Sequence, residues 1–173
     1  MNNFAAVIGL LFLFAGCSAS GPGFQDTPYA KQQAPEDKAR IIFLRQDDSY
    51  IGGRWARLDV DGAPVGKVAR EGFLVIDTAP GEREISVAED EAKNRLAVKM
   101  SLEPGQTYYL RVYRHEGLST WGGTSSTVEA TGVFALIGGL FTVFRKDDQA
   151  TFQLEPLHPW LALKMLEGLK LSE

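Results

Sequence analysis

Few side chains of this sequence stand at spacings that support catalysis. His115 and His158 have no second histidine or carboxylate at the interval of a ligand or catalytic pair, so we interpret both as surface or capping residues. The sequence contains no G-x-S-x-G, H-E-x-x-H, P-loop or G-x-G-x-x-G motif. Asp59-Val60-Asp61-Gly62 starts like a calcium loop but lacks the later oxygen ligands, and it is typical of a hairpin turn. We therefore expect a noncatalytic protein without cofactor or metal.

Trp121 and the hydroxyl groups after it form the candidate ligand-binding loop. Gly122-Gly123 follows the tryptophan, and Thr124, Ser125, Ser126 and Thr127 come next. An indole ring beside hydroxyl groups can stack on a sugar or a peptide, so Trp121, Thr124 and Ser125 are the predicted contacts with a ligand or partner. The alternative is a loop whose tryptophan folds back over the core. The acidic run Glu89-Asp90-Glu91 predicts a solvated loop.

Cys17 closes an apolar N-terminal segment. Residues 4–15 are apolar apart from Gly9, which is the length of a signal-peptide core and too short to span a bilayer. Leu13-Phe14-Ala15-Gly16-Cys17 resembles the lipobox of bacterial lipoproteins, in which the cysteine thiol receives the lipid. The resemblance implies a signal peptide over residues 1–16, lipidation of Cys17 and, with Ser18 next, an outer-membrane lipoprotein facing the periplasm. The alternative is a buried N-terminal segment with a free cysteine.

Length and composition predict one folded domain after a linker. The chain has 173 residues, of which 45% are apolar and 23% charged, with a net charge of -4 and a single cysteine. This composition is typical of a globular domain and offers no basic excess for nucleic acid and no partner for a disulfide. Residues 17–38 are rich in Gly, Pro, Gln and charge without an apolar period, so we predict the lipidated cysteine followed by a flexible tether.

Short apolar or alternating runs after residue 38 predict a mainly β domain over residues 39–173. Turn signals such as Asp61-Gly62, Pro80-Gly81 and Pro104-Gly105 separate these runs. The spacing is typical of a small antiparallel β-sandwich rather than of βαβ units. The expected strands are 39–46, 55–61, 64–69, 72–77, 82–89, 94–102 and 106–114. The predicted core residues, which alternate along these strands, are Ile85, Val87, Leu96, Val98, Met100, Leu102, Tyr108, Leu110 and Val112.

Two further segments follow the predicted strands. Residues 130–144 are apolar and uncharged, and Gly138-Gly139 at their centre favours a core hairpin, with a buried helix or a surface patch that touches lipid or a partner as alternatives. Residues 150–155 predict a last strand. Pro159 and Gly168 frame a short helix over 160–167, with Leu161, Met165 and Leu169 on the face expected to pack on the sandwich.

Several of these pieces together resemble a known bacterial family. They are Ala39-Arg40-Ile41-Ile42-Phe43-Leu44-Arg45, Leu58-Asp59-Val60-Asp61-Gly62 with Val65-Gly66, Gly72-Phe73, Thr78-Ala79-Pro80-Gly81-Glu82-Arg83 and Pro104-Gly105-Gln106-Thr107-Tyr108-Tyr109-Leu110. Their order is similar to the family catalogued as domain of unknown function 2846, over about residues 39–114. The resemblance implies a prealbumin-like β-sandwich outside the cytoplasm, with no active site.

Three hypotheses of function follow. The first is a membrane-anchored envelope lipoprotein that acts as a noncatalytic structural or binding module, whose partners are the membrane and an envelope protein or cell-wall glycan. The second is a periplasmic hydrolase or metal-dependent enzyme with a site formed only in the fold. The third makes residues 130–144 a membrane-contacting element.

Overall fold

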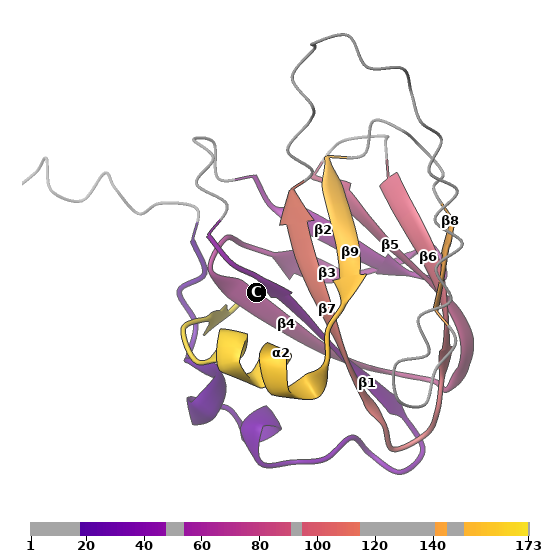
Figure 1. Ribbon diagram of the computed structural model, residues 1–173, viewed down its shortest axis with the longest axis horizontal. Coiled ribbons are helices and arrows are strands. Elements are labelled where there is room, and N and C mark those ends of the chain that lie inside the picture. Colours follow the sequence, from indigo (N-terminus) through magenta and orange to yellow (C-terminus); the bar gives the residue numbers. More distant parts are fainter. Residues whose placement is uncertain (1–17, 48–53, 91–94, 115–140, 145–150, 173) are drawn as a thin grey trace, which may run out of the picture.

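The computed structural model describes residues 18–47, 54–90, 95–114, 141–144 and 151–172 of the chain, with backbone alone for 141–144. Two five-stranded sheets pack face to face in this part of the chain (Figure 1). The first sheet has the strand order β10-β4-β1-β7-β9 and the second has the order β3-β2-β5-β6-β8. The predicted mainly β sandwich with a short C-terminal helix is therefore confirmed.

The strand boundaries follow the turn signals of the sequence. The strands are β1 (Ala39–Arg45), β2 (Ala56–Val60), β3 (Ala63–Val68), β4 (Gly72–Thr78), β5 (Gly81–Glu89), β6 (Arg95–Leu102), β7 (Thr107–Arg114), β8 (Phe141–Phe144), β9 (Phe152–Pro156) and β10 (Lys170–Leu171). Asp61 and Gly62 both take positive φ angles, 51° and 79°, as the two-residue turn between β2 and β3 requires. The hairpin interpretation of this segment is confirmed.

The two sheets bury one central core between them. All the predicted core residues from Ile85 to Val112 belong to it, with Tyr108 partly buried at its margin. Phe43, Leu58 and Phe152 are large, fully buried side chains of the same core, and the sequence pattern did not predict them as core residues. Alternate residues of each strand meet here because side chains of a strand point to opposite faces in turn.

Strand pairing in the β10-to-β9 sheet is mixed, so the prediction of an antiparallel sandwich is wrong for this sheet. The pairs β1–β4 and β7–β9 are antiparallel, whereas β1–β7 and β10–β4 are parallel. A parallel pair needs a long crossover, and the chain between β1 and β7 supplies it with β4 of the same sheet and with β2, β3, β5 and β6 of the other sheet. The β3-to-β8 sheet is antiparallel throughout.

A third layer covers the outer face of the β10-to-β9 sheet. It consists of α2 (Pro159–Leu166) and an N-terminal segment with two short 3-10 helices, η1 (Phe24–Asp26) and η2 (Pro28–Ala30). A second core lies beneath this layer and contains Phe24, Ile42, Leu44, Phe73, Leu157, Ala162, Leu166 and Leu169. Figure 1 shows η1, η2 and α2 on the same side of this sheet. We call this assembly of residues 18–38 and α2 the covering layer.

The predicted flexible tether is wrong for residues 18–38. Phe24 is 2% exposed and packs edge-on against Phe73, with ring centroids 5.4 Å apart. Ala19, Thr27 and Ala34 are buried as well. The segment lacks apolar periodicity because few of its side chains reach the core, and backbone hydrogen bonds hold it instead.

The apolar segment 130–144 is described only at its end. Phe141–Phe144 forms β8, which pairs antiparallel with β6. These four residues are extended, against the helical alternative, and the proposed hairpin around Gly138-Gly139 lies outside the described residues. The helices among the described residues lack the combination of length and hydrophobicity that a bilayer-spanning helix requires.

Candidate functional site

The residues predicted to carry function lie outside the described residues. This applies to Cys17, to the loop residues Trp121, Thr124 and Ser125, and to His115. His158 is described, and its imidazole accepts a hydrogen bond of 3.4 Å from the backbone N–H of Trp160 at the start of α2. Its interpretation as a capping residue is confirmed.

The chain enters the folded domain directly at Ser18. Ser18 forms a β-bridge with Arg70, and the backbone N–H of Ala19 donates to the carbonyl of Arg70 over 3.0 Å. Gly21 donates to the carbonyl of Leu171 over 3.2 Å, and Leu171 donates back to Pro22 over 2.8 Å. The residue that follows Cys17 is thus fixed against the start of β4, and the next few residues are fixed against the C-terminal strand β10.

Gly72 makes this junction possible. A Cβ at this position would meet the Ser172 hydroxyl and would lie 2.8 Å from the Cβ of Ala19 and 3.0 Å from the carbonyl oxygen of Ala69. The Ser172 hydroxyl in turn accepts a 3.1 Å hydrogen bond from the backbone N–H of Ala69. The N-terminal segment, the start of β4 and the C-terminus therefore converge on a residue without a side chain.

Arg40 holds the other end of the N-terminal segment. It is 4% exposed, and its guanidinium donates to both carboxylate oxygens of Asp77 over 2.8 and 3.0 Å. The same group donates to the backbone carbonyls of Gln32 and Gln33 and lies 5.1 Å from the centre of the Tyr29 ring. The hydrogen bonds to Asp77 raise the pKa of Arg40 above its ordinary value, so the group stays charged.

Two tyrosines of β7 lie on opposite faces of the same sheet. Burial raises the pKa of Tyr109, which packs in the second core, while the nearby charge of Arg40 partly opposes this rise. Burial also raises the pKa of Tyr108, whose hydroxyl oxygen accepts a 2.8 Å hydrogen bond from the backbone N–H of Glu103. Both hydroxyls are therefore harder to ionise than a tyrosine in water.

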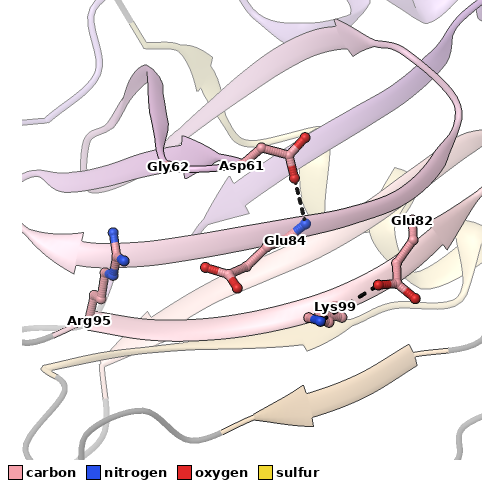
Figure 2. A pocket seen from close by; sticks show the side chains of 6 residues that line it. All are labelled: Asp61, Gly62, Glu82, Glu84, Arg95 and Lys99. Carbon is pink, nitrogen blue, oxygen red and sulfur yellow. Dashed lines mark hydrogen bonds and ion pairs between the residues drawn. The ribbon is translucent and has the colours of Figure 1, made fainter.

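A shallow polar hollow lies on the outer face of the other sheet. It has a volume of about 430 Å³ and is lined by residues of β5, β6 and the β2–β3 turn, namely Asp61, Gly62, Glu82, Glu84, Arg95 and Lys99. Figure 2 shows these side chains spread over an open surface, with Glu84 between Asp61 above and the β6 cations below. The face that carries them is opposite to the one that supplies Ile85, Val87 and Val98 to the central core.

Asp61, Glu82 and Lys99 of this hollow form ion pairs within the protein. One oxygen of Asp61 accepts a 2.9 Å hydrogen bond from the backbone N–H of Glu84, and the other lies 3.0 Å from Arg83. Lys99 lies 3.6 Å from Glu82. Carboxylates and cations alternate across neighbouring strands, which stabilises a sheet and also suits a ligand that carries both charges. Among the described residues, no group of three His, Cys, Asp or Glu side chains could hold a metal ion.

Sequence reasoning missed this hollow, although the strands carry its signal. The alternation that places Ile85 and Val87 in the core also places Glu82 and Glu84 together on the other face. The solvated loop predicted for the acidic run after them is wrong in part. Glu89 ends β5, is 8% exposed and pairs with Arg54 and the hydroxyl of Thr151, whereas Asp90 pairs with Lys67 over 2.6 Å.

The fold and the open polar hollow define a small β-sandwich module of mixed-charge surface. Residues 35–124 match the family model described as Protein of unknown function (DUF2846). The match spans more than half of the chain, and the protein belongs to this family. Comparisons with curated proteins and with solved structures find no match.

Proposed function

We propose that this protein is a membrane-anchored lipoprotein of the bacterial envelope, in which Cys17 carries the lipid and the β-sandwich acts as a noncatalytic structural or binding module. The position of Cys17 carries the proposal. Small residues and an apolar run precede it, and Ser18, the next residue, is bridged to the domain. A peptidase that cuts before Cys17 would leave every described contact of the domain intact.

The β-sandwich supports a binding role more than a catalytic one. The carboxylates of the polar hollow lie on an open surface, Asp61 and Glu82 pair with Arg83 and Lys99, and the described residues that line the hollow include no histidine. General acid or base chemistry depends on a group whose environment shifts its pKa toward the working pH, usually within a site sheltered from water. The candidate partners are another envelope protein or cell-wall glycan, contacted through the hollow or through Trp121, Thr124 and Ser125.

The anchor is tested by replacing its sulfur. We expect Cys17→Ala to abolish incorporation of radiolabelled palmitate, to retain the signal peptide and to move the protein out of the washed outer-membrane fraction. Ser18→Ala, one residue along, is the matched control and should still be labelled. A Cys17→Ala protein with unchanged mass and unchanged sedimentation with membranes would refute the proposal.

The binding role is tested in cells by crosslinking. A photoreactive amino acid at position 121 and another at Lys99 probe the loop and the hollow separately, and mass spectrometry identifies what each captures. We expect at least one position to give a discrete adduct with an envelope protein or with glycan. The same probe at Gln106, an exposed residue just before β7 that lies outside the hollow and the covering layer, is the matched control. Equal, diffuse capture at all three positions would contradict a specific binding surface.

A further inference from the structure

The covering layer exposes an apolar patch on α2. Ala162 and Leu166 of this helix are buried against the sheet, whereas Trp160 is 63% exposed and Leu163 is 41% exposed. They are the large apolar side chains that stand exposed in the described part of the chain. Residues three apart on a helix are neighbours, so the indole and the leucine form one patch.

The patch belongs to the same layer as the point where the chain leaves Cys17. The helix ends at Leu166, and β10 begins four residues later at Lys170. Gly23 forms a β-bridge with Lys170, and Gly21 and Pro22 are hydrogen-bonded to Leu171. Residues 18–23 therefore run along the β10 edge of the sheet, and Phe24, which follows them, lies in the second core together with Ala162 and Leu166 of α2.

Without a tether, a lipid on Cys17 would keep the start of the domain close to the membrane and limit the orientations that the domain can take. Consecutive Cα atoms are about 3.8 Å apart, so a lipid on Cys17 would hold Ser18 and the residues packed around it at the headgroups. Tryptophan is enriched at the membrane–water interface because its ring is apolar and its N–H is polar. Lys31 and Lys164 of this layer are exposed, and the exposed Asp26 and Glu167 offset their charge, so the proposed contact is apolar rather than electrostatic.

We propose that the covering layer is the membrane-facing surface of the protein, and that Trp160 and Leu163 enter the interface of a phospholipid bilayer. This inference rests on the proposed function, because it needs a lipid at Cys17. The β3-to-β8 sheet then faces away from the membrane, since its outer face is opposite to the covered face across the central core. The polar hollow with Lys99 is thereby presented to the aqueous compartment.

The test imposes the anchor chemically, so that it does not depend on acylation in cells. The chain from Cys17 onward, which contains every described residue, is coupled through the Cys17 thiol to a maleimide phospholipid in phosphatidylcholine–phosphatidylglycerol vesicles. Trp55→Phe and Trp121→Phe leave Trp160 as the single tryptophan of the three in the chain. We expect a blue shift and about twofold or greater quenching of Trp160 by acyl-brominated lipid, because an indole at the interface contacts the chains.

Two matched variants show whether the contact with the bilayer is specific to the face that carries Trp160 and Leu163. In the first, Trp160→Phe is combined with Lys99→Trp, which moves the single tryptophan to the opposite sheet, and this residue should remain unquenched. In the second, Leu163→Ser should weaken the quenching of Trp160. Equal quenching at positions 160 and 99, or none at 160, would overturn the inference.

The remaining outcomes are also decisive. A blue shift of Trp160 that depends on protein concentration and occurs without vesicles would assign the patch to a second copy of the chain and overturn the membrane assignment. Failure of the proposed function is seen separately, in the Cys17→Ala fractionation. A circular dichroism spectrum identical to that of the unmodified chain shows that each variant is folded.

Discussion

Replacing Arg40 measures what fixes the N-terminal segment to the domain. Arg40→Met keeps the apolar stem but removes the guanidinium, and with it two hydrogen bonds to Asp77 and those to the carbonyls of Gln32 and Gln33. Hydrogen bonds that involve a charged group contribute about 1.5–3 kcal/mol each, and breaking a fully buried ion pair costs about 3–5 kcal/mol. Asp77 is 32% exposed and can be partly rehydrated, so we expect a loss of about 2–3 kcal/mol in the free energy of unfolding.

Urea unfolding followed by circular dichroism gives the loss in the free energy of unfolding for Arg40→Met, for Asp77→Asn and for the double variant. A double-mutant cycle isolates the Arg40–Asp77 pair, for which we expect a coupling energy of about 1–2 kcal/mol. Lys99→Met is the matched control, because its exposed ion pair should contribute less than about 1 kcal/mol. A change below about 0.5 kcal/mol for Arg40→Met would refute the reasoning, since that is the range of ordinary surface substitutions.

Hydrogen exchange locates the effect within the same variant. The amide of Lys31 donates to the carbonyl of Pro28 and that of Gln32 to the same oxygen, so both should be protected in the native protein and exchange faster in Arg40→Met. The amide of Ser172, which donates to the carbonyl of Phe73 over 2.8 Å, serves as the internal reference and should keep its protection. Unprotected amides at Lys31 and Gln32 in the unmodified protein would instead support the original prediction of a flexible tether.

Three other predictions follow from the packing and the pKa shifts. Phe24→Ala should destabilise the domain by about 3 kcal/mol in urea, as loss of a buried aromatic ring does, whereas Gln25→Ala should change it by less than about 0.5 kcal/mol. Gly72→Ala should cost about 1–3 kcal/mol because its Cβ overlaps Ala19 and Ser172, whereas Gly168→Ala, with open space around it, should not lower the thermal midpoint. For Tyr108 and Tyr109 the native pKa lies above the value of about 10 in the unfolded chain, so their contribution to stability is complete below pH 10 and is lost as the pH rises through the native pKa. Absorbance titration at the phenolate band should show that Tyr109→Phe removes a transition with a midpoint above 10, and a removed transition at or below 10 would contradict the shift.

The strands were predictable because local chemistry sets their ends. Asp61-Gly62 needs positive φ angles that few residues adopt, and the pairs Pro80-Gly81 and Pro104-Gly105 end β4 and β6 in the same local way. Alternation then assigned the faces of β5, β6 and β7 correctly. Which strands share a sheet was not predictable, since the β1–β7 pairing joins residues far apart in the chain.

One feature of the sequence could have predicted the covering layer, although the assignment of strand faces by alternation did not take it into account. β1 is apolar on both faces, with Ile41 and Phe43 in the central core and Ile42 and Leu44 in the second core. A strand that is apolar on both faces is covered on both, which implies a further layer over the sheet. What supplies that layer depends on Phe24 and Arg40 meeting partners elsewhere in the chain, and no local pattern contains this information.

The central position of β1 in its sheet determines when folding of the domain can be completed. β1 is synthesised before the other described strands, yet one of its two neighbours is β7, and the covering layer above it needs α2 from late in the chain. Pairings between distant segments form slowly, because the entropy of closing the loop is lost before the contacts form. The hairpins of the β3-to-β8 sheet can assemble early, whereas β1 stays open until the last residues arrive, so a truncated C-terminus would leave an apolar strand exposed to aggregation.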